Sequence, residues 1–203
     1  MNNNLTNPYI IGNNVGNSHA FVGREDILEK ILSVIENNYQ NTIALFGQRR
    51  IGKTSILTKL KVTLPEKGSY LPIFIDFQDM PKLSLPKLLQ ELTKRINDGL
   101  PEDVSELSCS DEHDFRNSLF QILKDNFQER KLVLLFDEFD ALIPVTENKT
   151  EHDFFPYIRK LIEDIDKKSI NFVFSVGRNA KDLNEIAGSI FKSIPNKPVS
   201  LLT

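Results

Sequence analysis

Residues 42–60 read TIALFGQRRIGKTSILTKL, and this stretch decides the fold. It opens with an apolar run typical of a buried strand and closes with an apolar pattern typical of a helix. Between the two, Gly47 and Gly52 allow backbone conformations that are closed to other residues, so successive N–H groups can turn inward around an anion at a helix N-terminus. A strand, a glycine loop and a helix in this order predict a phosphate-binding loop.

The loop also carries the side chains that such a site requires. Lys53 would reach the β- and γ-phosphates of a nucleotide as a point charge, and the Thr54 hydroxyl would ligate Mg²⁺. At least one of Arg49 and Arg50 is expected to point away from the nucleotide, toward an acidic neighbour or a partner. The residues expected to bind the nucleotide here are Gly47, Arg50, Ile51, Gly52, Lys53, Thr54 and Ser55.

A second chemical signal is the stretch VLLFDE at residues 133–138. A buried parallel strand that ends in two acids delivers them to the edge of the sheet where ligands bind. Asp137 would hold the hydrated Mg²⁺, and Glu138 would orient and deprotonate a water for attack on the γ-phosphate. Any buried strand that leaves the core can end in two acids, but the phosphate loop earlier in the chain favours the catalytic interpretation. Asp140 would either extend the metal site or cap the next turn.

Arg178 follows the fourth apolar run and is the third catalytic candidate, beside Lys53 and Glu138. Its guanidinium could stabilise charge on the γ-phosphoryl group, or it could be a solvated loop arginine. His19, His113 and His152 are isolated in polar contexts and do not indicate a metal site. No serine, histidine and acid arrangement favours a nucleophilic mechanism.

Strands and helices alternate along the chain. Besides the strand before the loop and the helix after it, strands are predicted at residues 71–77, 131–136, 169–176 and 198–202, and helices at 27–35, 84–97, 111–127, 151–166 and 179–191. Pro72 is expected at the start of its strand, where a missing N–H is tolerated. This alternation predicts an α/β fold with right-handed crossovers and a five-stranded parallel sheet.

The composition is that of one ordinary globular domain, with 203 residues, 40% apolar and 26% charged. Residues 1–20 contain seven asparagines and predict an N-terminal arm, which leaves residues 21–203 as the core. The net charge of −3 gives no argument for nucleic acid as a partner. The single cysteine, Cys109, excludes an internal disulfide and fits a reducing cytosol. Because no apolar run is long enough to cross a bilayer and no signal peptide is visible, a cytoplasmic protein without a membrane partner is expected.

Four stretches together resemble the ATPase core of STAND proteins, the signal-transduction relatives of AAA+ ATPases. They are FVGRE at 21–25, the loop at 47–54, DEFD at 137–140 and GR at 177–178. The resemblance implies a three-layer P-loop NTPase with strand order 5-1-4-3-2, an adenine pocket near Val22 and Arg24, and a γ-phosphate-sensing role for Arg178. It also implies ATP or ADP with Mg²⁺ as cofactor. Family members usually continue into a helical lid and a winged helix, which residues 21–203 lack.

The leading hypothesis is therefore an ATP-binding, slowly hydrolysing switch domain of a signalling or defence protein. Its partners would be the nucleotide and other proteins or further copies of itself in the full-length context. An initiator or loader ATPase that acts on DNA is the alternative, because Asp-Glu-x-Asp also resembles that branch of AAA+. A non-hydrolysing module that uses nucleotide only for structure is a third hypothesis, although the presence of Glu138 argues against it.

Overall fold

The computed structural model describes residues 23–80, 83–143, 153–177, 191 and 194–200. Its strands are β1 (Thr42–Phe46), β2 (Tyr70–Asp76), β3 (Lys131–Asp137), β4 (Ile170–Val176) and β5 (Asn196–Pro198). Its helices are α1 (Glu25–Ile35), α2 (Lys53–Glu66), α3 (Leu85–Asn97), α4 (Glu112–Asn126) and α5 (Phe154–Asp164), and η1 (Phe139–Leu142) is a 3₁₀ turn.

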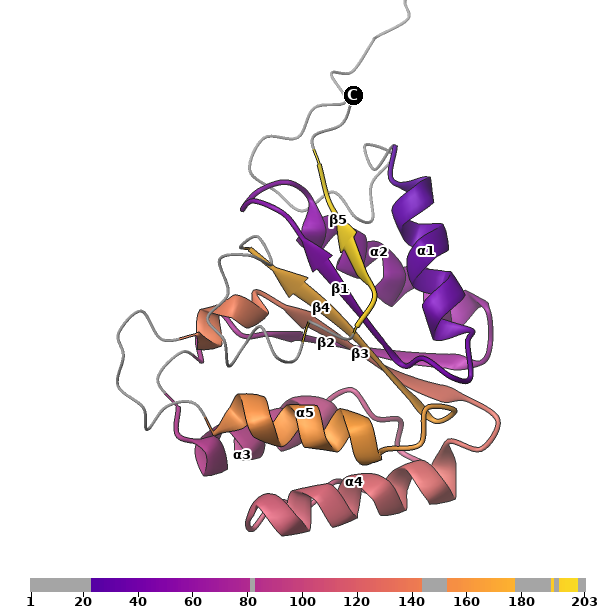
Figure 1. The fold of residues 1–203 in the computed structure, drawn as a ribbon. Coiled ribbons are helices and arrows are strands. Elements are labelled where there is room, and N and C mark those ends of the chain that lie inside the picture. Colours follow the sequence, from indigo (N-terminus) through magenta and orange to yellow (C-terminus); the bar gives the residue numbers. More distant parts are fainter. Residues whose placement is uncertain (1–22, 81–82, 144–152, 178–190, 192–193, 201–203) are drawn as a thin grey trace, which may run out of the picture.

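The five strands form one sheet in the order β2-β3-β4-β1-β5, and every pair of neighbours is parallel. Helices α1 and α2 cover one face of this sheet, and α3, α4 and α5 cover the other (Figure 1). The predicted α/β class, the three layers and the strand order 5-1-4-3-2 are confirmed. The fourth strand therefore lies between the strand that leads into the glycine loop and the strand that ends in two acids.

The central strands are buried because both of their faces are covered by helices. β1 and β4 are buried along their whole length, and β3 is buried except at its first residue. Their sequences are correspondingly apolar runs rather than alternating patterns. Since all strands are parallel, the glycine loop after β1 and the acids at the end of β3 lie at the same edge of the sheet.

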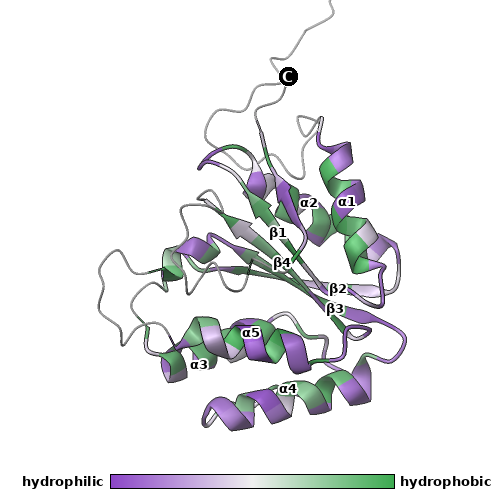
Figure 2. Ribbon diagram, in the orientation of Figure 1, coloured by the Kyte–Doolittle hydropathy of each residue, from purple (hydrophilic) through white to green (hydrophobic). Residues whose placement is uncertain are grey.

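The apolar core has two parts, one on each face of the sheet. The core on the α1 and α2 side contains Ile31, Ile56, Leu60 and Val173 among others. The core on the α3, α4 and α5 side is larger and rich in phenylalanine, including Phe77, Phe136, Phe139, Phe172 and Phe174. Figure 2 shows the hydrophobic strands between helices that each present a hydrophilic side outward.

Several predicted boundaries differ from the structure. β5 covers 196–198 instead of 198–202, and α5 ends at Asp164, two residues before the predicted end. β2 begins at Tyr70, so Pro72 is its third residue and not its first. Pro72 is tolerated there because β2 is an edge strand that pairs only with β3, so the sheet needs fewer of its N–H groups.

Some predictions concern residues outside the part that the structure describes. These are the N-terminal arm at 1–20 and nearly all of the helix at 179–191. Phe191 is described and is buried in the phenylalanine-rich core, where its ring lies 5.5 Å from that of Phe46. None of the described helices has the length and apolar character to cross a membrane.

Candidate active site

The glycine loop joins the end of β1 to the start of α2 by two unusual backbone conformations. Arg50 has a φ of 64° and Gly52, the N-cap of α2, has a φ of 100°. Gly47 is constrained by space instead, since a Cβ placed there would lie 2.6 Å from the carbonyl oxygen of Val199. Its own N–H donates to the carbonyl of Val176 on β4 at 3.3 Å. The loop is therefore held between β4 and the segment that follows β5.

The Lys53 side chain turns back into the loop. Its Nζ donates to the carbonyl oxygens of Gly47 and Gln48, at 2.9 Å each. Lys53 is 3% exposed, so the residue is largely withdrawn from water. Thr54 is the next residue of α2 and lies half-buried at the helix N-terminus, where backbone N–H groups and the helix dipole favour an anion.

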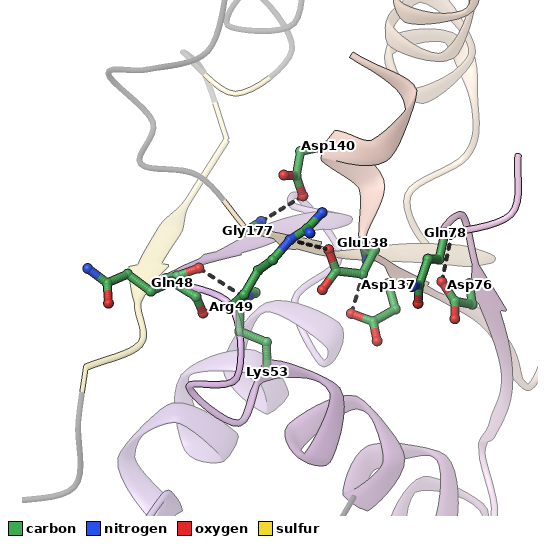
Figure 3. A network of polar contacts seen from close by, with 10 residues as sticks. Gln48, Arg49, Lys53, Asp76, Gln78, Asp137, Glu138, Asp140 and Gly177 are labelled. Carbon is green, nitrogen blue, oxygen red and sulfur yellow. Dashed lines mark hydrogen bonds and ion pairs between the residues drawn. The ribbon is translucent and has the colours of Figure 1, made fainter. Parts of the chain in front are cut away.

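The two acids at the end of β3 differ in backbone conformation. Asp137 completes the strand, is 2% exposed, and accepts the N–H of Glu138 on Oδ1 at 3.0 Å. Glu138 adopts a left-handed conformation with a φ of 48°, which turns its side chain toward the loop (Figure 3). Its Oε2 lies 3.8 Å from Nε of Arg49. Arg49 therefore points toward an acidic neighbour, and both Arg49 and Arg50 are exposed. The expectation that a loop arginine points away from the nucleotide stays a prediction.

Asp140 belongs to η1 and connects this turn to the end of β4. Its Oδ1 accepts the N–H of Gly177 at 2.7 Å (Figure 3). A Cβ on Gly177 would lie 3.1 Å from Oδ2 of the same carboxylate, so the two residues are in close contact. Beneath them, the ring of Phe139 packs edge-on against that of Phe174 with centroids 4.7 Å apart. The hydrogen bond to Gly177 and the aromatic contact with Phe174 therefore help to fix the acid-bearing turn.

The charges at this edge of the sheet influence one another. Burial lowers the pKa of Lys53, and the carboxylates of Glu138, Asp137 and Asp140 oppose this shift. Burial also raises the pKa of Glu138, with further contributions from Asp140 and Asp137, while Lys53 and Arg49 act in the opposite direction. Three carboxylates thus act on one buried ammonium group, and a bound cation would relieve the repulsion between the carboxylates.

The donor set fits Mg²⁺. The ion prefers oxygen ligands and is usually held by one or two protein side chains together with nucleotide phosphates and water. The Asp137 carboxylate and the Thr54 hydroxyl are two such oxygens at neighbouring elements of the site. Among the described residues there is no group of three or more histidine, cysteine or acidic side chains that could hold a metal ion without a nucleotide. Oε2 of Glu138 and Oγ of Ser175 are buried and have no hydrogen-bond partner among the described residues.

The structure brings most of the predicted site residues together and shows how Arg24 is held, while its predicted place in an adenine pocket stays a prediction. The Arg24 guanidinium is buried and donates to the carbonyls of Ile51 and Ser200, at 2.9 and 2.8 Å. Ser55 is buried in the first turn of α2. Val22 and Arg178 lie outside the described residues, so their predicted roles stay predictions.

Sequence reasoning did not single out Asp76 or the bond between Asp140 and Gly177. Asp76 ends β2 directly beside Asp137 in the sheet register, and its Oδ1 accepts the N–H of Gln78 at 2.8 Å (Figure 3). Asp76 could have been found from the sequence, because it lies at the carboxyl end of a predicted strand. A cavity of about 280 Å³ lies at the opposite edge of the sheet, before β1, and is lined in part by Tyr39, Asn41 and Arg159. It shares no residue with the loop or the acids.

A parallel sheet with a glycine loop after its first strand, a buried lysine in that loop and two acids on a nearby strand end defines a P-loop ATPase core. A family model described as "ATPase domain predominantly from Archaea" matches residues 21–182. The chain belongs to this family.

Known proteins resemble the chain over part of their length. The uncharacterized ATP-binding protein MJ1609 of Methanocaldococcus jannaschii is 30% identical over 70 residues, which are 34% of this chain and 19% of that protein. The structure of Drosophila ORC bound to DNA superposes with a TM-score of 0.64 and 15% identity, over 88% of this chain and 43% of that one. Cdc6p from Pyrobaculum aerophilum superposes with a TM-score of 0.60 and 18% identity, over 93% of this chain and 49% of that one. At these identities the solved structures share the fold, and the chain spans less than half of each of the three proteins.

Proposed function

We propose that this domain binds ATP with Mg²⁺ and hydrolyses it. The observation that carries the proposal is the position of Lys53, whose buried ammonium rests on two loop carbonyls beside the acids at the end of β3. An ammonium group in that place can exchange the carbonyls for phosphate oxygens. Family membership and the ATP-binding relative support the same conclusion.

Each residue has a distinct task in this mechanism. The loop N–H groups and Lys53 bind the phosphates and withdraw negative charge from the γ-phosphoryl group. Thr54 and Asp137 hold Mg²⁺, which when bound neutralises charge on the phosphate oxygens. Glu138 orients a water in line with the γ-phosphate and accepts its proton on Oε2, an atom that accepts no hydrogen bond from the described residues. Arg178, which lies outside the described residues, is proposed to contact the γ-phosphate.

The fold comparisons favour an initiator- or loader-type ATPase that acts on DNA over a STAND-type switch. ORC in its DNA-bound form and Cdc6p both superpose over most of the chain. The net charge of −3 lends no support to DNA binding by the domain as a whole, so contact with DNA would need a local basic surface or a further part of the protein. A STAND-type switch is the second candidate, because the stretches at 21–25 and 177–178 are the features on which that resemblance rests.

The decisive test measures nucleotide binding and phosphate release for the wild type and three variants. Lys53→Ala is expected to abolish ATP binding, and Glu138→Gln to retain binding while turnover falls at least about 100-fold, since a positioned base contributes that much or more. Lys61→Ala is the matched control, because it removes the same charge from an exposed position of the same helix. Binding of ATP that survives in Lys53→Ala, or unchanged turnover in Glu138→Gln, contradicts the proposal.

A second measurement separates the two functional classes. Binding to duplex DNA is followed by fluorescence anisotropy with ATP present, at salt concentrations from about 50 to 200 mM. An affinity that falls steeply with salt supports the initiator-type function. ATP turnover without any DNA binding, combined with ATP-dependent self-association, supports the STAND-type switch.

A further inference from the structure

The Arg24 side chain joins three parts of the molecule that are far apart in sequence. It stands immediately before α1, and its Nη2 donates to the carbonyl of Ile51 in the phosphate loop at 2.9 Å. Its Nη1 donates to the carbonyl of Ser200, after β5, at 2.8 Å. Arg24 is only 8% exposed. One buried cation therefore bridges the phosphate loop and the segment that leaves the sheet.

The same two segments also meet at the other end of the loop. The N–H of Val199 donates to the carbonyl of Phe46, and the Val199 carbonyl oxygen occupies the space next to Gly47. The phosphate loop is consequently fixed to residues 199–200 both where it begins and, through Arg24, at Ile51, two residues before α2 begins.

A guanidinium group suits this task because its donors are fixed in one plane and can serve two acceptors at once. A lysine in its place presents a single ammonium at the end of a flexible stem and cannot hold both carbonyls in the same geometry. If the bridge is removed, the two carbonyls lose a charged donor in a position with little access to water.

We infer that Arg24 is a positioning residue that couples the phosphate loop to the segment Val199–Ser200, so that the nucleotide state of the loop is passed to the chain beyond β5. This inference rests on the proposed function, because it requires a nucleotide in the loop. In this inference the Arg24 guanidinium binds the carbonyls of Ile51 and Ser200, and it does not bind the base of the nucleotide.

Hydrogen exchange with mass spectrometry tests the coupling. Peptides that cover the loop and peptides that cover 196–200 are followed with and without a non-hydrolysable ATP analogue and Mg²⁺. In the wild type, the analogue is expected to slow exchange in both regions. In Arg24→Gln at saturating analogue, exchange is expected to slow in the loop alone, and Arg24→Lys is expected to show a reduced effect at 196–200.

The matched control is Lys197→Gln. Lys197 Nζ lies 2.8 Å from Oδ2 of Asp26 and so joins α1 to β5 on the surface without reaching the loop. This variant is expected to keep the full effect of the analogue on both regions. Two outcomes overturn the coupling alone. In the first, the analogue slows exchange at 196–200 as much in Arg24→Gln as in the wild type. In the second, the analogue slows exchange in the wild-type loop but not at 196–200. Absence of protection in the wild-type loop overturns the proposed function and the coupling with it.

Discussion

Gly47→Ala is the substitution whose outcome depends most directly on the geometry of the loop. The added Cβ would lie 2.6 Å from the Val199 carbonyl oxygen, 3.0 Å from Cγ2 of Ile51 and 3.3 Å from Cβ of Val199. The first of these contacts is with backbone, which cannot rotate away. The loop and the segment after β5 must therefore separate, and the separation displaces the Gly47 carbonyl that holds Lys53.

The cost follows from the size of this displacement. Opening the contact from 2.6 Å to the 3.0 Å below which Cβ atoms are essentially never found requires a backbone shift of about 0.4 Å. Overpacking of this kind costs about 1–3 kcal/mol, and the lower entropy of the unfolded alanine chain offsets about 0.4–1 kcal/mol of it. A net loss of about 1–2 kcal/mol corresponds to a Tm lower by about 2–8 °C for a domain of this length.

The assay is thermal unfolding with and without ATP and Mg²⁺, and Gly68→Ala is the control. Gly68 has a φ of 79° and no atom within 4 Å of an added Cβ, so alanine there is strained only by its backbone conformation. We expect the stabilisation by ATP to shrink in Gly47→Ala and to stay at the wild-type value in Gly68→Ala. A Gly47→Ala domain with wild-type Tm and the full stabilisation by ATP would refute the close packing of Val199 on the loop.

Three further predictions concern single side chains. Asp140→Ala removes the acceptor of the Gly177 N–H, so the Tm should fall by the equivalent of about 1–3 kcal/mol and ATP turnover should fall with it; unchanged values of both would contradict the role of this bond. Asp111→Ala removes the N-cap of α4, which accepts two backbone N–H groups, and should cost about 1 kcal/mol in thermal unfolding without changing ATP turnover. Burial raises the pKa of Cys109, so its alkylation rate in the folded domain should rise only at a higher pH than in the domain unfolded in denaturant; identical pH profiles would be the contrary result.

The sequence predicted the elements whose cause is local. The central strands are continuous apolar runs, the glycine loop needs its residue types at fixed spacing, and Asp111 marks the start of α4 with a capping side chain. The strand order could not be predicted in this way, because the alternation of strands and helices indicates a parallel sheet but not the order of its strands. The order was predicted from the resemblance to known ATPases. The edge position of β2 then explains why Pro72 can lie inside a strand.

The remaining features depend on contacts between residues that are distant in sequence. Arg24 finds its acceptors 27 and 176 residues away, and Asp140 finds Gly177 after 37 residues. No periodicity or short motif encodes such pairs. The left-handed conformation of Glu138 is also unexpected from the sequence, because residues other than glycine rarely adopt it. It depends on the strand before Glu138 and the turn after it.

The division of the core between the two faces of the sheet has an evolutionary consequence. The helix that follows the phosphate loop packs on the α1 side, whereas Phe139, beside the acids, packs among the phenylalanines of the opposite face. Substitutions around Phe139 therefore act first on the acid-bearing turn, and substitutions around α2 act first on the helix that follows the phosphate loop. Substitution of the phenylalanines around Phe139 could lower ATP turnover while nucleotide affinity is retained. Affinity and turnover can therefore diverge among descendants of this domain.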